Sequence, residues 1–343
     1  MLPLSSSLVG ALALGFASIA FSCGGTSSTS SPQDAGADSS SPMDASANVD
    51  ASREASPDTS VPLGPAALLF AGDGPALLKD TWELSGTGWT QRTVSGPSGR
   101  FHHAMASLGG KIVLFGGNDL AKDLDDTWEW DGATWTQKMV TGPSARHGHT
   151  MATFGGKIVL YGGSAGSFVG DTWEWDGAAW TEKMVTGPGN RYGHTMAATS
   201  TKVMVFGGVG AFAETWEWDG AAWTKNSVTI AASPSERAFS SSASLGGKVL
   251  LFGGQHDANN ILSDTWEWDG AAWTQRTMTI GPSPRYHHGM TTFQGNVVLF
   301  GGSPPSGSPT PWLGDTWQWD GASWTKPTMT GPGGRLVYTL AAR

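Results

Sequence analysis

Cysteine is almost absent from this sequence, and charged residues are scarce. One residue of 343 is a cysteine and 14% are charged. A single cysteine cannot form an internal disulfide. The formal net charge is -9 and no basic stripe occurs, which excludes the electrostatic footprint of a nucleic-acid-binding surface, so we expect no nucleic acid partner. Glycine and tryptophan are abundant instead, at 49 and 18 residues, a composition typical of short strands joined by tight turns.

The N-terminal segment lacks an apolar run long enough for a comfortable membrane span. Residues 1–22 read MLPLSSSLVGALALGFASIAFS and are followed by Cys23. Their apolar run has about the length of a signal-peptide core. AFSC followed by a Ser/Gly/Asp tract resembles a bacterial lipoprotein signal. The resemblance implies that residues 1–22 are a signal peptide, that Cys23 is lipidated, and that the exported protein is anchored in the bacterial cell envelope, at the outer membrane or the cell surface. The alternative is ordinary signal cleavage, which leaves a free thiol.

Large side chains are rare in residues 23–64, which are mostly Ser, Ala, Asp, Gly and Pro. Such a segment cannot bury enough apolar surface to offset the entropy lost on ordering. We therefore expect a disordered tether, with an end-to-end distance of about 35 Å for a flexible coil of this length.

Residues 65–343 are built from an internal repeat. Its marker is an arginine that follows a GP or SP segment, and it recurs at intervals of 45 to 50 residues: Arg100, Arg146, Arg191, Arg237, Arg285 and Arg335. One unit contains four strand-like pieces, HTMATF, KIVLYGG, DTWEW and WTEKMV, with the turn residues GGK and DGA between the first and last pairs. This alternation of β-rich runs and Gly/Asp turns predicts a four-stranded antiparallel meander in each repeat.

The landmarks of the unit resemble the kelch motif. A double glycine ends the second strand of five repeats, Ala71–Gly72 replaces it in the first, and Trp128 precedes Trp135 by seven positions, a spacing that all six repeats keep. The resemblance covers essentially all of 65–343 and implies an all-β, six-bladed β-propeller. A WD-type propeller, suggested by GH and WD pairs, does not explain the double glycines.

The two ends of the repeat region predict how the ring closes. The last residues, RLVYTLAAR, match only the first strand of a repeat, whereas PAALLFAGDG near residue 65 matches a second strand. We therefore expect the C-terminal strand to complete a blade with the three N-terminal strands, which leaves few exposed strand edges.

Most tryptophans are predicted to be structural. All except Trp312 lie in copies of the DTWEWDGAAWT segment, where alternate side chains share one face of a strand and pack against the next blade. The DG pairs are predicted to be hairpin turns. Trp312 lies in a loop and is a candidate binding contact. The loops between second and third strands vary most, and variable loops on a rigid scaffold are where binding usually resides.

One group of polar residues recurs three positions after the marker arginines: His103, His149, His194, Ser240, His288 and Tyr338. The resemblance to kelch proteins places the start of each first strand at the central channel, so His103, His149, His194, His288 and Tyr338 are candidate ligand contacts at the pore mouth, with His102, His147 and His287 as neighbours. Neutral imidazoles are common metal ligands. The alternative is that these residues belong to the structural consensus of the repeat; we assign no metal and no cofactor.

No catalytic constellation is visible in the sequence. Copper-radical chemistry of the galactose oxidase type, which shares a kelch propeller, needs a Cys–Tyr cross-link and is excluded because Cys23 lies outside the propeller. We therefore expect a membrane-tethered, non-enzymatic module that binds a protein or glycan through its variable loops. The alternative is a periplasmic or surface carbohydrate-modifying enzyme of the sugar mutarotase type.

Overall fold

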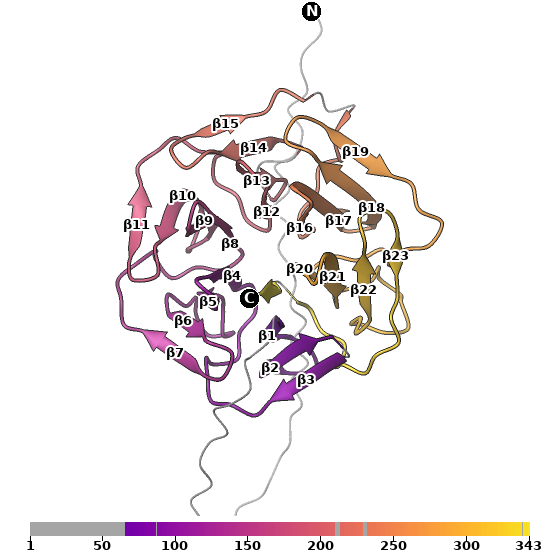
Figure 1. The fold of residues 1–343 in the computed structure, drawn as a ribbon, viewed down its shortest axis with the longest axis horizontal. Coiled ribbons are helices and arrows are strands. Elements are labelled where there is room, and N and C mark those ends of the chain that lie inside the picture. Colours follow the sequence, from indigo (N-terminus) through magenta and orange to yellow (C-terminus); the bar gives the residue numbers. More distant parts are fainter. Residues whose placement is uncertain (1–65, 87, 210–212, 229–231, 338) are drawn as a thin grey trace, which may run out of the picture. The chain divides into compact units, whose positions relative to one another are not determined.

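Six four-stranded antiparallel sheets stand around a central axis, and each sheet is one blade of a propeller (Figure 1). The computed structural model describes residues 66–86, 88–209, 213–228, 232–337 and 339–343, which belong to one unit, Ser60–Arg343. The predicted signal peptide, Cys23 and the tether lie outside the described residues, as does Tyr338. Within the described ranges, no helix is long and apolar enough to cross a membrane.

Each blade takes its strands from one repeat, apart from the blade that joins the two ends of the propeller. Blade 1 contains β1 (Ala67–Asp73), β2 (Leu77–Ser85), β3 (Gly88–Arg92) and β24 (Ala341–Ala342). Blade 2 contains β4 (Ala104–Leu108), β5 (Lys111–Phe115), β6 (Thr127–Trp130) and β7 (Trp135–Lys138). Blade 3 contains β8 (Thr150–Phe154), β9 (Lys157–Ser164), β10 (Phe168–Trp175) and β11 (Trp180–Lys183).

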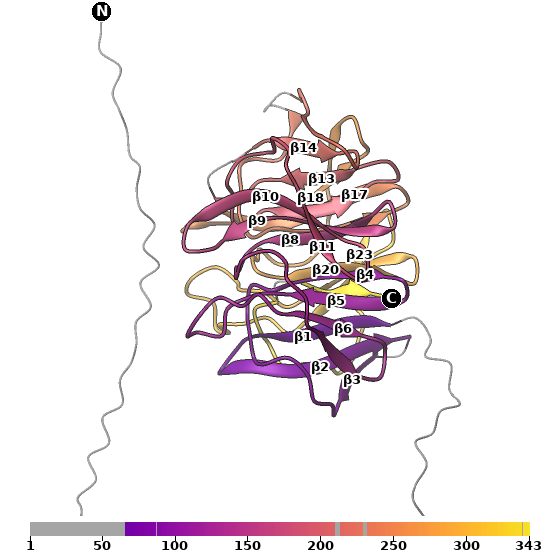
Figure 2. The same cartoon turned by 90° about the vertical axis from the view of Figure 1, so that its left-hand side faces the viewer.

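The remaining three blades repeat this order, and Figure 2 shows the ring of blades from the side. Blade 4 contains β12 (Thr195–Ala198), β13 (Val203–Phe206), β14 (Thr215–Trp218) and β15 (Trp223–Lys225). Blade 5 contains β16 (Ser241–Leu245), β17 (Lys248–Asp257), β18 (Asn260–Trp268) and β19 (Trp273–Arg276). Blade 6 contains β20 (Gly289–Phe293), β21 (Asn296–Phe300), β22 (Thr316–Trp319) and β23 (Trp324–Thr325).

The ring closes as the sequence predicts. β24 pairs antiparallel with β1, with Ala67 opposite Ala342 and Leu68 opposite Ala341. The strand order in blade 1 is therefore β24-β1-β2-β3, which joins the two ends of the propeller in a single sheet. The six-bladed, all-β architecture expected from the repeat count is confirmed.

The middle of the second strand of each blade is apolar because it is buried on both faces. In β5, Ile112 and Leu114 pack in the core between blades 1 and 2. Val113 and Phe115, on the opposite face of the strand, pack in the core between blades 2 and 3. A strand covered on both sides needs a continuous apolar run instead of an alternating one. The propeller therefore has a separate hydrophobic core between each pair of neighbouring blades.

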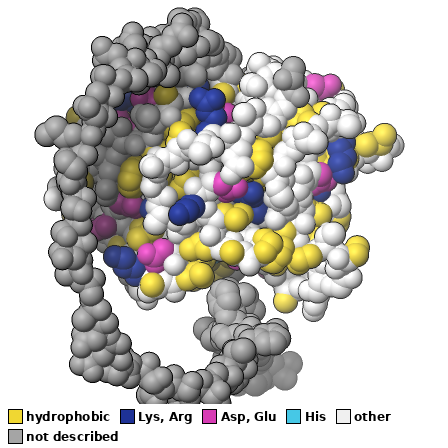
Figure 3. Space-filling view, turned by 90° about the horizontal axis from the view of Figure 1, so that it is seen from below, with side chains coloured by type: hydrophobic (Ala, Val, Ile, Leu, Met, Phe, Trp, Pro, Cys, Tyr) yellow, Lys and Arg dark blue, Asp and Glu magenta, His cyan; other side chains and the backbone are white. Residues whose placement is uncertain are grey.

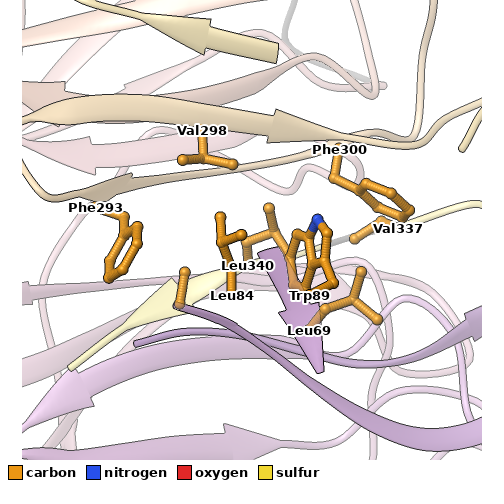
Figure 4. Close-up of a cluster of buried hydrophobic side chains, with 9 residues drawn as sticks. Leu69, Leu84, Trp89, Phe293, Val298, Phe300, Val337 and Leu340 are labelled. Carbon is orange, nitrogen blue, oxygen red and sulfur yellow. The ribbon is translucent and has the colours of Figure 1, made fainter. Parts of the chain in front are cut away.

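The core between blades 6 and 1 shows how the two ends are held together (Figure 4). Leu69, Leu84 and Trp89 of blade 1 face Phe293, Val298 and Phe300 of blade 6, and Val337 and Leu340 near the C-terminus complete the cluster. Closure thus rests on apolar packing as well as on the two-residue pairing of β24.

Tryptophan side chains link every blade to the one before it. The indole Nε1 of Trp135 donates a hydrogen bond to Thr81 Oγ1 of blade 1, at 3.1 Å. The same hydrogen bond recurs at four further junctions, in the pairs Trp180–Thr127, Trp223–Thr172, Trp273–Thr215 and Trp324–Thr265. Trp89 closes the circle by donating to Thr316 of blade 6 at 3.0 Å. The repeated DTWEW segment therefore supplies the same packing volume and the same inter-blade hydrogen bond at each junction.

The marker arginines hold the link before each first strand against the third strand of the same blade. Arg146 is buried and makes a bidentate pair with Asp171, at 2.6 and 2.8 Å, while also donating to the carbonyl of Gly162. Arg335 makes the corresponding pair with Asp80, across the junction of the two ends. A bidentate guanidinium–carboxylate pair fixes orientation as well as distance, so these pairs set the position of the residues that follow each arginine.

Candidate functional site

Loops of unequal length gather on one face of the ring. Six isolated bridges join the residue after each marker arginine to the end of a second strand or to the residues just after it: Phe101–Asn118, His147–Ser164, Tyr192–Val209, Ala238–Gln255, Tyr286–Ser303 and Leu336–Asp73. The links between blades and the variable loops therefore share this face, which we call the variable-loop face. The opposite face, which carries the GG and DG turns, is called the short-turn face. Trp312 lies half-buried in the loop between β21 and β22.

A cavity of about 280 Å³ lies between the first strands of the blades. Its lining is alanine, serine, threonine and methionine for the most part, with His103, His149 and His194 at one end. No Asp, Glu, Lys or Arg is among the described residues that line it. The lining of the central channel therefore has no charged side chain as long as its imidazoles are neutral.

The four predicted histidines lie near one end of this channel: His103, His149 and His194 line it, and His288 lines the small pocket at its mouth. His103, His149, His194 and His288 are each no more than 3% exposed. Each imidazole packs edge-on against an aromatic ring in the second strand of the preceding blade, as His103 does on Phe70 at 5.9 Å between ring centroids. The structure therefore brings these side chains around one axis, and their role as ligand contacts stays a prediction.

Burial keeps these imidazoles neutral. Desolvation, with the nearby marker arginines as a second cause, lowers the pKa of His103 and of His194 to about 3. The pKa values of His149 and His288 are lowered well below their usual range for the same reasons. His194 Nε2 is hydrogen-bonded to Thr150 Oγ1 at 2.7 Å, whereas neither ring nitrogen of His103 or His149 has a hydrogen-bond partner.

A group of rings that we call the mouth cluster lies at the end of the channel on the variable-loop face. Its members are His102, His147, Tyr192, Phe239 and His287. The ring of His102 is stacked on that of His147 and on that of Phe239, at 5.7 and 6.2 Å, and the Tyr192 ring meets all three edge-on. The Tyr192 hydroxyl is 2.7 Å from His102 Nδ1.

Backbone geometry directs these rings inward over the axis. His102, Phe239 and His287 have φ between 53° and 58°, in the left-handed region, and Gly148 and Gly193 take the equivalent positions in blades 3 and 4 with φ of 66°. Consecutive members of this set are joined by backbone hydrogen bonds, from Gly148 N to His102 O onward to Val337 N and His287 O. A side chain on either glycine would collide with Tyr192 or with Phe239.

The mouth cluster is the part of the propeller that departs from the repeat. Two positions after the marker arginines the sequence reads His, Gly, Gly, Phe, His and Val, so one ring position has four residue types. Sequence reasoning noticed the histidines there but missed Tyr192 and Phe239. Comparing this column of the repeat is the signal that could have found Phe239, and comparing the column directly after the marker arginines is the signal that could have found Tyr192.

One polar pair stands beside the cluster. His147 Nδ1 donates to Asp123 Oδ1 at 2.6 Å, and both side chains are about one-quarter to one-fifth exposed, at 24% and 20%. Asp123 comes from the loop between β5 and β6, and no other blade has this pair because only blade 3 has a histidine directly after its marker arginine. Among the described residues, no group of three or more His, Cys, Asp or Glu side chains is placed to hold a metal ion.

The fold and the repeat landmarks together define a kelch-repeat β-propeller. Residues 61–208 match the family model of the KLHDC2/KLHL20/DRC7 Kelch-repeats domain, and the rest of blade 4 and blades 5 and 6 continue the same repeat beyond the match. A search of curated proteins finds no match to this chain. The kelch propeller fold suggests a protein-interaction module, and domains of this family are generally non-enzymatic.

Proposed function

We propose that this protein is a non-enzymatic binding module that docks a protein partner on its variable-loop face. The observation that carries the proposal is the mouth cluster, a patch of aromatic and imidazole rings at the centre of that face. Phe168, at the start of β10, extends the patch outward: its ring is stacked on Tyr192 at 5.7 Å, and the residue is 38% exposed. Aromatic residues at the centre of a patch, with polar residues around them, are typical of interface hot spots.

The surroundings of the patch support the same function. The loops that border it differ in length and sequence from blade to blade, whereas the DG turns on the opposite face are nearly uniform. In these turns the aspartate carboxylate accepts backbone N–H groups within its own turn, as Asp131 does from Ala133 and Thr134, so the uniform residues are structural. On the edge of the ring seen in Figure 3, charged side chains of both signs are interspersed with apolar and uncharged ones, which offers no single-sign surface for a partner.

The test is capture of a partner by variants of the mature chain. Phe168→Ser removes an exposed ring from the patch, and Met184→Ser removes a still more exposed apolar side chain, 87% exposed, from the link after β11. We expect the wild-type protein and Met184→Ser to retain the same protein from an extract of the source cells, and Phe168→Ser to retain at least tenfold less, because loss of a hot-spot ring costs about 2 kcal/mol. Equal retention by all three would refute the proposal, and loss of binding after glycosidase treatment of the extract would indicate a glycan.

A carbohydrate-modifying enzyme of the mutarotase type is a second candidate, and the Asp123–His147 pair is the observation that favours it. A carboxylate that orients a half-buried imidazole is an arrangement suited to general acid–base catalysis. An enzyme would change the anomeric balance of a sugar in polarimetry, and His147→Gln would abolish that change. No turnover of any sugar by the wild-type protein would leave the binding function as the better account.

We further propose that the module is exported and tethered by a lipid on Cys23, as the N-terminal sequence predicts. The intact mass of the protein purified from its own membranes tests this directly. A mass that begins at Cys23 and includes a diacylglycerol and an acyl chain would support the anchor. A mass equal to the full chain or to an unlipidated cleaved chain would refute it.

A further inference from the structure

Two methionine side chains lie on the surface, outside every hydrophobic core. Met139 and Met184 are each 87% exposed, in the links that follow β7 and β11. The other methionines of the described ranges are buried or half-buried: Met105, Met151, Met196, Met204, Met278, Met290 and Met329. Because hydrophobic stabilisation requires that apolar surface be removed from water, packing does not account for Met139 and Met184.

The pair departs from the repeat. Four positions after the tryptophan that opens each fourth strand, blades 2 and 3 have Met139 and Met184, whereas the other blades have a hydroxyl side chain: Thr93, Ser227, Thr277 and Thr328. The next position is apolar in all six blades, and Val185 there packs against the core between blades 3 and 4. The outward position is therefore polar by rule, and a thioether at this position in two neighbouring blades indicates a role for the sulfur instead of for its bulk.

The backbone places the two methionines in the same way. Val140 N donates a hydrogen bond to the carbonyl of Lys138 at 3.0 Å, and the equivalent bond around Met184 measures 2.8 Å. Each methionine is thus the central residue of a three-residue γ-turn. Three residues further on, Gly142 approaches the Trp180 ring so closely that a Cβ would collide with it. The link is therefore held against the propeller, while the methionine side chain stays exposed to solvent.

Exposure makes a thioether susceptible to oxidation to the sulfoxide, a change that dedicated reductases reverse. We propose that Met139 and Met184 are a pair of reversible oxidation sites, which each take one oxygen atom from a peroxide and are restored by a thiol-dependent methionine sulfoxide reductase.

The forward and return steps balance. A lone pair of the sulfur attacks one peroxide oxygen, and the S–O bond forms as the O–O bond breaks. The proton of the attacked oxygen passes to the departing one, so the sulfur is oxidised by two electrons and the peroxide is reduced to water or an alcohol. In the return step two thiols are oxidised to a disulfide, the thioether is regenerated, and the oxygen leaves as water.

Oxidation at these two positions leaves the fold intact. A sulfoxide is polar, and it disrupts packing where the methionine belongs to a core. Met139 and Met184 have no such packing to lose. The methionines that line the channel are the opposite case, since none is more than 7% exposed: Met105, Met151, Met196 and Met290. The chain therefore combines sites that tolerate the sulfoxide with buried sites that the fold protects.

The test is oxidation of the mature chain by hydrogen peroxide, followed over time by peptide mapping with mass spectrometry. We expect sulfoxide to form at Met139 and Met184 as fast as in N-acetylmethionine amide, and about tenfold faster than at the channel methionines. Urea should abolish this difference, because it exposes every methionine. Reductases specific for each sulfoxide epimer, supplied with dithiothreitol, should then restore both residues in the folded protein.

A variant that carries both Met139→Leu and Met184→Leu is the matched control, since leucine keeps the apolar volume and cannot form a sulfoxide. Peroxide treatment should leave Tm unchanged in the wild type and in this variant. Channel methionines that oxidise as fast as Met139 would overturn the proposal, as would sulfoxides that the reductases leave in place or a fall in Tm that only the wild type shows. No partner takes part in these reactions, so their outcome is independent of the proposed binding function.

Discussion

Mild acid should unfold this propeller, because its buried imidazoles cannot take up protons while the chain is folded. The pKa of His103 and of His194 is about 3 in the folded state, against 6.5 for an ordinary imidazole. Between these two values the unfolded chain binds more protons than the folded chain, so the free energy of unfolding falls as the pH falls. The stabilisation is therefore fully present above about pH 6.5 and declines below it.

The size of the effect follows from linkage. Each pH unit below the ordinary pKa removes about 1.4 kcal/mol per group, so at about pH 5 the two histidines together lower the free energy of unfolding by about 4 kcal/mol. His149 and His288 act in the same direction, because their pKa values are lowered too. The Arg146 guanidinium holds the pKa of Asp171 below its usual value, and the stabilisation from this carboxylate is lost only in stronger acid, as the pH falls below about 4. A loss of this size is a large part of the total stability of a domain, about 5–15 kcal/mol.

Urea unfolding followed by tryptophan fluorescence at several pH values between about 7.5 and 5 measures this slope. His103→Leu should reduce the slope by about one proton, or about 1.4 kcal/mol per pH unit, whatever it does to stability at neutral pH. Met105→Leu, which changes a neighbouring channel residue without a titratable group, should leave the slope unchanged. A free energy of unfolding that stays constant over this range would refute the reasoning, as would an unaltered slope in His103→Leu.

Three further changes test the parts of the fold that position the site. Gly148→Ala should lower the free energy of unfolding by about 2 kcal/mol, since the new methyl group meets the Tyr192 ring. Gly155→Ala, at a left-handed position with open space around it, should lower it by about 1 kcal/mol. Equal urea midpoints for the two variants would contradict this packing of Gly148 against Tyr192. Asp171→Ala should lower the free energy of unfolding by about 3 kcal/mol in the same assay, because it leaves the buried guanidinium of Arg146 without its carboxylate. A change under about 0.5 kcal/mol would show that the Arg146–Asp171 pair does not stabilise the fold. Deleting residues 340–343 should lower Tm and speed hydrogen exchange in β1, because that strand loses its only partner on one side; exchange in β1 that matches the full chain would mean that β24 does not hold the ring closed.

Much of the architecture could be predicted from the sequence, and for a local reason. Strands of two to ten residues and the turns between them depend on side-chain alternation and on glycine and aspartate at the bends, all of which a single repeat contains. Repetition then sets the blade number, and the incomplete first and last repeats imply the closure that β24 and β1 make. The assignment of the DTWEW tryptophans to packing is also correct, because a ring needs the same volume at every junction.

The candidate site was predicted only in part. The sequence brought His103, His149, His194 and His288 together, since they share one column of the repeat, but it could not show that their rings are buried near one end of the channel. Depth along the axis depends on how the marker arginines hold the preceding link against Asp126, Asp171 and their equivalents. That pairing joins residues some 25 positions apart, and its effect on the following residues is geometric.

The repeat, the strands, the turns and the closed ring of blades could all be inferred from the amino-acid sequence. The mouth cluster, the Asp123–His147 pair and the neutral channel became visible only in the folded protein. The physical reason is that repeat landmarks act within one blade or between neighbours, so any single copy contains them. The rings of His102, Tyr192 and Phe239 come from three different blades and meet only where the closed ring brings six links to one axis, with a backbone conformation that no local pattern requires.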